Sequence, residues 1–185
     1  TEAEVTEFRS FTRRRGLDEP LQYIEGTVPF GPVTIHVDDR VLVPRPETEC
    51  LFELLTSRSG SPSVIVDLCT GSGNLALALK AMFPDADVYA TDLSEEAVAV
   101  ARKNAEMNGL DVTFLDGDLF DPLPGHLRGT VDLLVANPPY LAESELADLP
   151  SDVLMEPRGA LVAGPAGDEL VERIGRDAAL WLSPG

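Results

Sequence analysis

Residues 64–73 read VIVDLCTGSG, an apolar run that ends at Asp67 and continues into a loop with glycines at positions 71 and 73. The pattern predicts a buried strand over 64–67 and a helix over 74–82, joined directly by this loop. Glycines at such a junction let the backbone pass close beneath a bound ligand. The stretch therefore indicates a nucleotide-type binding loop.

Further apolar runs alternate with helical patterns beyond this loop. We expect strands at 88–92, 112–115 and 131–136, and a helix over 95–108. Apolar runs of this length between helices are typical of a parallel sheet covered on both faces. The chain is thus predicted to be α/β, with a Rossmann-like sheet.

The residues before the first strand predict a smaller N-terminal region. A helix is expected over 2–15. Apolar and polar residues alternate over 33–37 and β-branched residues return at 41–43, which favours a hairpin. We divide the chain into an N-terminal helical segment at 1–22, a β-hairpin linker at 23–45 and a main domain at 46–185. A helix that begins near Pro46 opens this domain.

Composition narrows the classes of function. The 185 residues carry a net charge of −18 and are 44% hydrophobic, so we expect one domain with a real core and no direct nucleic-acid binding. Two cysteines and two histidines indicate neither a disulfide framework nor a metal site. Because no apolar stretch is long enough for a bilayer and the start is not a signal peptide, we expect a cytoplasmic protein with no membrane partner.

The end of the second expected strand helps to define the ligand. Asp92 lies about 20 residues past the loop, where a carboxylate can accept both ribose hydroxyls of an adenosine. Gly71, Gly73 and Ala76 also satisfy the dinucleotide fingerprint, so the loop alone leaves the cofactor open. Asp67 favours S-adenosylmethionine, because a carboxylate suits an ammonium and a sulfonium better than a pyrophosphate. The alternative is that Asp67 only caps the following turn.

The turn after the third expected strand lies beside strand one at the ligand edge of such a sheet. There Asp118 is a candidate acceptor for the adenine amino group, and Leu119 or Phe120 is a candidate for covering the ring face. A plain loop carboxylate is the alternative for Asp118.

The fourth expected strand continues into NPPY, residues 137–140. A planar nitrogen is a poor nucleophile because its lone pair is delocalised, so an enzyme must fix its hydrogens to aim the lone pair at a methyl group. The Asn137 side-chain oxygen and the Pro138 carbonyl are suitable acceptors, and Tyr140 can stack on a planar group. We favour this interpretation over a simple turn, which is the alternative.

Five blocks resemble a known family, the protein glutamine N5-methyltransferases that modify the Gly-Gly-Gln glutamine of peptide-chain release factors. The blocks are 23–26 (YIEG), 40–49 (RVLVPRPETE), 67–73 (DLCTGSG), 137–140 (NPPY) and 156–161 (EPRGAL). The resemblance implies a class I fold, S-adenosylmethionine as cofactor and a release factor as partner.

The residues and the resemblance together give the expected site. Methyl-donor binding is assigned to Asp67, Cys69, Thr70, Gly71, Ser72, Gly73, Asp92, Leu93, Asp118, Leu119 and Asn137. Acceptor binding is assigned to Arg45, Pro46, Glu47, Thr48, Asn137, Pro138, Pro139 and Tyr140, of which Asn137, Pro138 and Tyr140 are the expected catalytic residues.

Two departures from the family and three rival functions accompany this interpretation. Relatives usually carry a helical bundle where this chain has only residues 2–15, and they continue into further strands, so strand four should be an open edge. We therefore expect a fragment, or a partner that covers the edge. The rivals are a nucleic-acid adenine N6-methyltransferase, a non-catalytic binding or assembly protein and, more distantly, a dinucleotide oxidoreductase.

Overall fold

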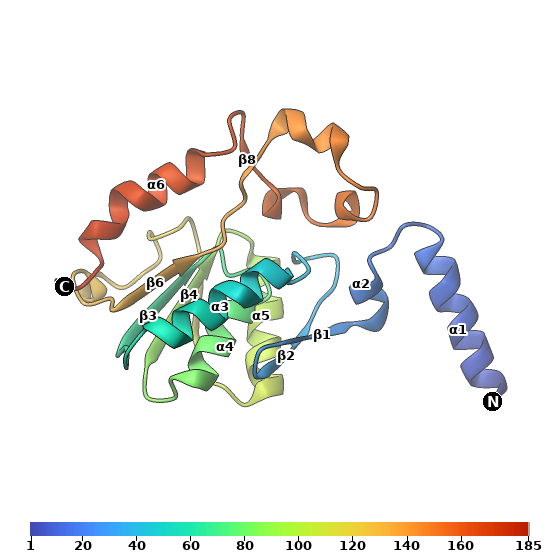
Figure 1. The fold of residues 1–185 in the computed structure, drawn as a ribbon, viewed down its shortest axis with the longest axis horizontal. Helices are drawn as coiled ribbons and strands as arrows, with labels where there is room; N and C mark the ends of the chain where they lie inside the picture. Colours follow the sequence, from blue (N-terminus) through green and yellow to red (C-terminus); the bar gives the residue numbers. More distant parts are fainter. Residues whose placement is uncertain (185) are drawn as a thin grey trace.

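A parallel sheet of four strands forms the centre of the computed structural model, which describes residues 1–184 (Figure 1). The strands are β3 (Val64–Leu68), β4 (Asp87–Asp92), β5 (Thr113–Asp116) and β6 (Leu133–Ala136). Their spatial order is β5-β4-β3-β6. The predicted α/β, Rossmann-like fold is confirmed.

The strand order places a switch point between β3 and β6. The chain adds β4 and then β5 on one side of β3, and it returns to the other side for β6. The chain after β3 enters α4 (Asn74–Met82) on one face of the sheet, whereas the chain after β6 leads to α6 (Glu169–Asp177) on the other face, so a crevice opens between the carboxyl ends of these two strands. Asp67 pairs in register with Ala90 of β4 and with Val135 of β6, so the expected loop begins at this crevice.

Helices cover both faces of the sheet. One face packs against α3 (Pro46–Arg58), α4 and α5 (Glu95–Asn108). The other face packs against α6, which lies at the top left of Figure 1. The sequence sets the ends of α5: the Ser94 hydroxyl accepts a hydrogen bond from the Ala97 amide, and Gly109 ends the helix with a φ of 64°.

The N-terminal region differs in part from the expectation. Helix α1 (Glu2–Arg15) has the expected bounds and no buried residue, and it stands at one side of Figure 1. A short helix, α2 (Leu21–Glu25), crosses the expected boundary at 22/23. The hairpin consists of β1 (Thr27–Phe30) and β2 (Val33–His36), so the expectation of a strand at 41–43 was wrong. Val41 and Val43 lie in a loop, and their side chains are buried in the core, which accounts for the apolar pattern at these positions.

The chain after β6 crosses back over the carboxyl edge of the sheet. A short parallel pair forms between β7 (Leu141–Ala142) and β8 (Val162–Gly164). Within residues 1–184, β6 is the edge of the main sheet, and just before it Val131 forms an isolated parallel bridge with Leu182. Short 3-10 helices lie at Gly125–Leu127, Glu143–Asp148, Val153–Met155, Arg158–Ala160 and Ala178–Leu180. Over the described residues, no helix has the length and apolarity that crossing a membrane requires.

Candidate functional site

A cavity of about 380 Å³ opens at the carboxyl ends of the strands, at the switch point. Its volume falls in the range of small-ligand sites. The expected site residues that line it are Arg45, Thr48, Asp67, Cys69, Thr70, Gly71, Ser72, Asp92, Leu93, Asp118, Leu119, Asn137 and Pro139. The fold therefore brings together two groups that are far apart in sequence, the loop after β3 and the segment before α3.

Asp67 lies beneath the cavity and is almost wholly buried. Its Oδ2 accepts a hydrogen bond of 2.6 Å from the Thr70 hydroxyl, so the carboxylate does hold the following turn. Burial raises the pKa of Asp67 to about 7, and the hydrogen bond from Thr70 lowers this pKa by less than burial raises it. A cationic group in the cavity would relieve this cost, so the turn-holding and ligand-binding interpretations are compatible.

Asp92 ends β4 and links it to the glycine loop. Its Oδ2 accepts from the Gly71 amide at 2.8 Å, and its Oδ1 accepts from the Ser94 amide at 2.9 Å. Burial also raises the pKa of Asp92. Each carboxylate oxygen can accept more than one hydrogen bond, so capacity remains for two hydroxyls of a ligand.

The backbone of the cavity floor adopts an uncommon conformation. Cys69 and Leu119 have φ of 57° and 50°, values that side-chain-bearing residues rarely adopt. Such strain is concentrated at functional sites. Burial raises the pKa of the Cys69 thiol to about 12, so this thiol is protonated and unreactive at neutral pH.

Gly73 belongs to the expected donor residues but does not line the cavity. Its φ is 80°, and a Cβ at this position would lie 3.1 Å from the Cβ of Ala101 and 3.3 Å from the ring of Phe114. This glycine is therefore required for close packing of the loop against α5 rather than for contact with a ligand.

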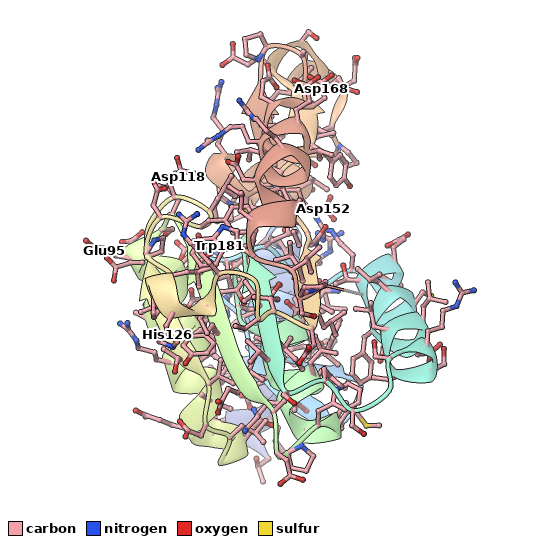
Figure 2. The ribbon with its side chains drawn as sticks, turned by 90° about the vertical axis from the view of Figure 1, so that its left-hand side faces the viewer. Glu95, Asp118, His126, Asp152, Asp168 and Trp181 are labelled. Carbon is pink, nitrogen blue, oxygen red and sulfur yellow. The ribbon has the colours of Figure 1, made fainter. Side chains whose placement is uncertain are left out.

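The turn after β5 separates the two ring-covering candidates. Leu119 lines the cavity, whereas Phe120 stacks on Trp181 in the core at 5.6 Å between ring centroids, so Phe120 is not available to a ligand. Asp118 lies on the same flank as Trp181, near the lower end of α6 in Figure 2. One of its oxygens accepts a 2.7 Å hydrogen bond from Arg173 of α6, and its other oxygen has no hydrogen-bond partner within residues 1–184.

Asn137 follows β6 and contacts the first turn of α3. Its Nδ2 donates to the Thr48 hydroxyl at 3.4 Å, and both residues line the cavity. The remaining members of the tetrapeptide diverge: Pro139 lines the cavity, while Pro138 does not and Tyr140 is 66% exposed. Pro46 and Glu47 also lie outside the lining.

Glu156 does not line the cavity but supports its wall, a role that the sequence alone did not assign. It is buried, and its carboxylate accepts from the Val43 amide at 2.9 Å and from the Arg45 guanidinium at 2.6 Å. It thereby fixes the segment before α3 to the chain after β6. In the sequence, Glu156 is the first residue of the EPRGAL block. This block supports the family resemblance, but it does not show what the glutamate does.

Twelve residues that do line the cavity were also not assigned from the sequence. They come from the segment before α3, from the first turns of α4 and α5, and from the chain after residue 156, and they are Arg40, Val41, Leu42, Pro44, Asn74, Leu75, Ser94, Ala97, Pro157, Gly159, Ala160 and Leu170. Most are apolar, and apolar residues in loops carry no pattern that separates a cavity wall from a core. Across residues 1–184 no three histidine, cysteine or acidic side chains lie together in a way that could hold a metal ion.

The switch point and the strained loop at its crevice place this chain among the Rossmann-like proteins with a nucleotide-type ligand site. Comparison with known proteins narrows this class. The methyltransferase small domain family matches residues 46–164, more than half of the chain, and the chain belongs to that family.

Two relatives illustrate the similarity in sequence. A Deinococcus radiodurans protein named release factor glutamine methyltransferase is 45% identical over 175 residues, which are 93% of this chain and 61% of that protein. A Synechocystis protein of the same name is 42% identical over an alignment of 186 positions that covers 96% of this chain and 62% of that protein. The chain thus spans about three fifths of the length of these relatives.

Solved structures support the fold. The hMettl16 catalytic domain, in complex with a MAT2A 3'UTR hairpin, has a TM-score of 0.59 at 22% identity over 79% of this chain and 56% of its own. The T. thermophilus 16S rRNA methyltransferase RsmC, in complex with AdoMet and guanosine, has a TM-score of 0.55 at 26% identity over 63% of this chain and 33% of its own.

Proposed function

We propose that this chain binds S-adenosylmethionine and carries the site that transfers its methyl group to the side-chain amide nitrogen of a glutamine in a peptide-chain release factor. The observation that carries the proposal is the orientation of Asn137 beside Thr48, in the wall of a cavity whose floor holds Asp67 and Asp92.

The donor half of the proposal rests on charge. When bound, S-adenosylmethionine supplies an activated methyl group on a sulfonium. Asp67 and Asp92 are both desolvated carboxylates, and neither has a basic side chain as a hydrogen-bond partner within the described residues. Such a pair favours a cationic ligand with hydroxyl groups and disfavours a pyrophosphate, so it counts against the dinucleotide alternative.

The acceptor half rests on the direction of the Asn137 amide. Because Nδ2 donates to Thr48, Oδ1 is left to accept a hydrogen bond from an incoming amide. We assign the second acceptor to the carbonyl of Pro138, which does not line the cavity of the unliganded chain and would have to turn toward a bound amide. Two acceptors that fix both hydrogens of an amide nitrogen would turn its lone pair toward the methyl group, so these residues would act by positioning. The transfer would release S-adenosylhomocysteine, and the nitrogen would lose its extra proton to solvent.

The identity of the acceptor rests on the relatives and on charge. Both relatives described above are named release factor glutamine methyltransferases, and the chain carries the block 40–49 that suggested this family. The net charge of −18 disfavours a nucleic-acid acceptor. On this proposal the Gly-Gly-Gln loop of the release factor enters past Arg45–Thr48 and Tyr140, and the protein works in the cytoplasm.

A transfer assay with a labelled methyl donor tests the proposal. The chain is incubated separately with a purified release factor and with adenine-containing DNA. Label in the release factor is the expected result. Label in the DNA alone would establish the adenine alternative, and failure of the chain to bind S-adenosylmethionine in calorimetry would favour a non-catalytic role.

A further inference from the structure

Helix α5 carries two asparagines, Asn104 and Asn108, one turn apart on the side that faces β2. Asn108 accepts from the Thr34 amide at 3.1 Å and donates to the Thr34 carbonyl at 2.8 Å. Asn104 accepts from the His36 amide at 2.7 Å and donates to the His36 carbonyl at 3.0 Å. Each side chain therefore makes the paired bonds that a neighbouring strand would make to alternate residues of β2.

The two asparagines differ in their third partner. The Nδ2 of Asn108 donates to the Asn104 carbonyl at 2.8 Å, a bond within α5. The Nδ2 of Asn104 donates at 2.9 Å to the carbonyl of Ser72, in the glycine loop. Asn104 is completely buried and Asn108 is not. Within residues 1–184, Asn104 is thus the side chain that bonds both the hairpin and the loop.

Both structures that Asn104 holds lead to the cavity. Ser72 lines the donor side, and the packing of Ala101 against Gly73 brings α5 close to the same end of the loop. Strand β2 leads into residues 40–45, all of which except Val43 line the acceptor side. A displacement of Asn104 would therefore shift one wall of the cavity relative to the other.

We propose that Asn104 is a positioning residue that fixes the donor loop against the acceptor-side segment, and that Asn108 is a structural clamp on the hairpin alone. The inference rests on the proposed function only where it calls one side of the cavity the methyl-donor side and the other the acceptor side. Without the bond from Asn104, the carbonyl of buried Ser72 has no hydrogen-bond donor. This raises the free energy of the folded state, and the loop can lower it only by moving.

The matched variants Asn104→Ala and Asn108→Ala test this role in the full chain. Hydrogen–deuterium exchange is measured without ligand for peptides that cover the hairpin and the loop, and binding of S-adenosylhomocysteine is measured by calorimetry. We expect faster hairpin exchange in both variants and faster exchange at 69–73 in Asn104→Ala alone. Affinity should fall about tenfold in Asn104→Ala and change less than about twofold in Asn108→Ala.

Equal loop exchange in the two variants, or unchanged affinity in Asn104→Ala, would overturn the inference. If Asn104→Ala does not fold, Asn104→Asp replaces it, because it keeps the shape and the acceptor for the His36 amide but loses the bonds that Nδ2 donates to the Ser72 and His36 carbonyls. It must show the same faster exchange at 69–73 that Asn108→Ala lacks. The exchange experiment needs no ligand, so a chain that binds no S-adenosylhomocysteine would count against the proposed function and leave the inference to be decided by exchange.

Discussion

The two walls of the cavity are held together in different ways. On the donor side, Asp67 bonds a residue 3 positions away and Asp92 bonds one 21 positions away. On the acceptor side, Asn137 bonds a residue 89 positions away and Glu156 bonds one 111 positions away. The donor wall is therefore local in sequence and built on strand ends, whereas the acceptor wall forms only when the chain after β6 meets α3 and the segment before it.

This difference separates two tasks of the site. Strand ends are rigid because their backbones are hydrogen-bonded into the sheet, so they suit a small cofactor that is always the same. Loops joined by side chains can adjust to a protein surface. Changes on the acceptor side should therefore affect turnover and acceptor affinity, while changes on the donor side should affect donor affinity.

The largest effect is expected from Asn137→Ala. Turnover should fall about a hundredfold, because one acceptor that orients the amide is lost, while donor affinity changes less than about threefold. Steady-state kinetics and calorimetry measure the two quantities. Unchanged turnover would remove Asn137 from the mechanism, and a parallel loss of donor affinity would break the separation of the walls.

Glu156→Gln should act on acceptor affinity. The variant keeps an oxygen for the Val43 amide but removes the charge opposite Arg45, which should raise the KM for the release factor about tenfold. Glu143→Gln is the matched control, because Glu143 pairs with Arg158 at the surface, where both side chains are more than half exposed. Equal effects of the two changes would contradict the role of Glu156.

Donor affinity should depend on pH through Asp67. Since its pKa in the folded protein is about 7, the carboxylate becomes charged as pH rises through this value, and affinity for a cationic donor should rise up to about tenfold between about pH 6 and about pH 8. Stability of the unliganded protein should move in the opposite direction. The folded protein holds a proton that the unfolded chain releases near 3.8, so the free energy of unfolding falls as pH rises from about 4 to about 7.

Asp67→Asn should flatten the pH profiles of donor affinity and of stability. The pH dependence that remains should come from Asp92, whose pKa is also raised by burial. Calorimetry over the pH range and urea unfolding provide the measurements. A steep profile for donor affinity that persists in Asp67→Asn would assign the dependence to another group.

The smallest effect is expected from Arg173→Met. The Arg173–Asp118 pair is exposed to solvent by about two fifths on each side, so its contribution is screened. Donor affinity should change less than about threefold, and acceptor kinetics should not change. A larger loss would show that α6 belongs to the donor wall through Asp118.

The same contrast explains how far the sequence could predict the molecule. The strand over 64–67, the helix over 74–82 and the positions of Asp67 and Asp92 follow from local periodicity and from the common geometry of parallel strands. The bounds of α4 and α5 agree with the expected helices, because caps and glycines at their ends act locally.

The remaining features depend on contacts between distant segments. Nothing local distinguishes Val41–Val43 as a buried loop rather than a strand, and alternation alone predicted the wrong partner for β2. Phe120 and Leu119 are adjacent, and only the packing of Trp181 decides which of them faces the cavity. Glu156 likewise gains a role only from Val43 and Arg45, more than a hundred positions away.

The position of the transferred methyl group tests the central claim most directly. Release factor is incubated with this chain and S-adenosylmethionine, and tandem mass spectrometry then locates the modification. The account predicts one added methyl group on the side-chain nitrogen of the Gly-Gly-Gln glutamine, and its loss when Asn137→Ala replaces the original chain. A methyl group on another residue, or equal methylation by the variant, would contradict the assignment of Asn137 as the residue that aims the acceptor at the donor.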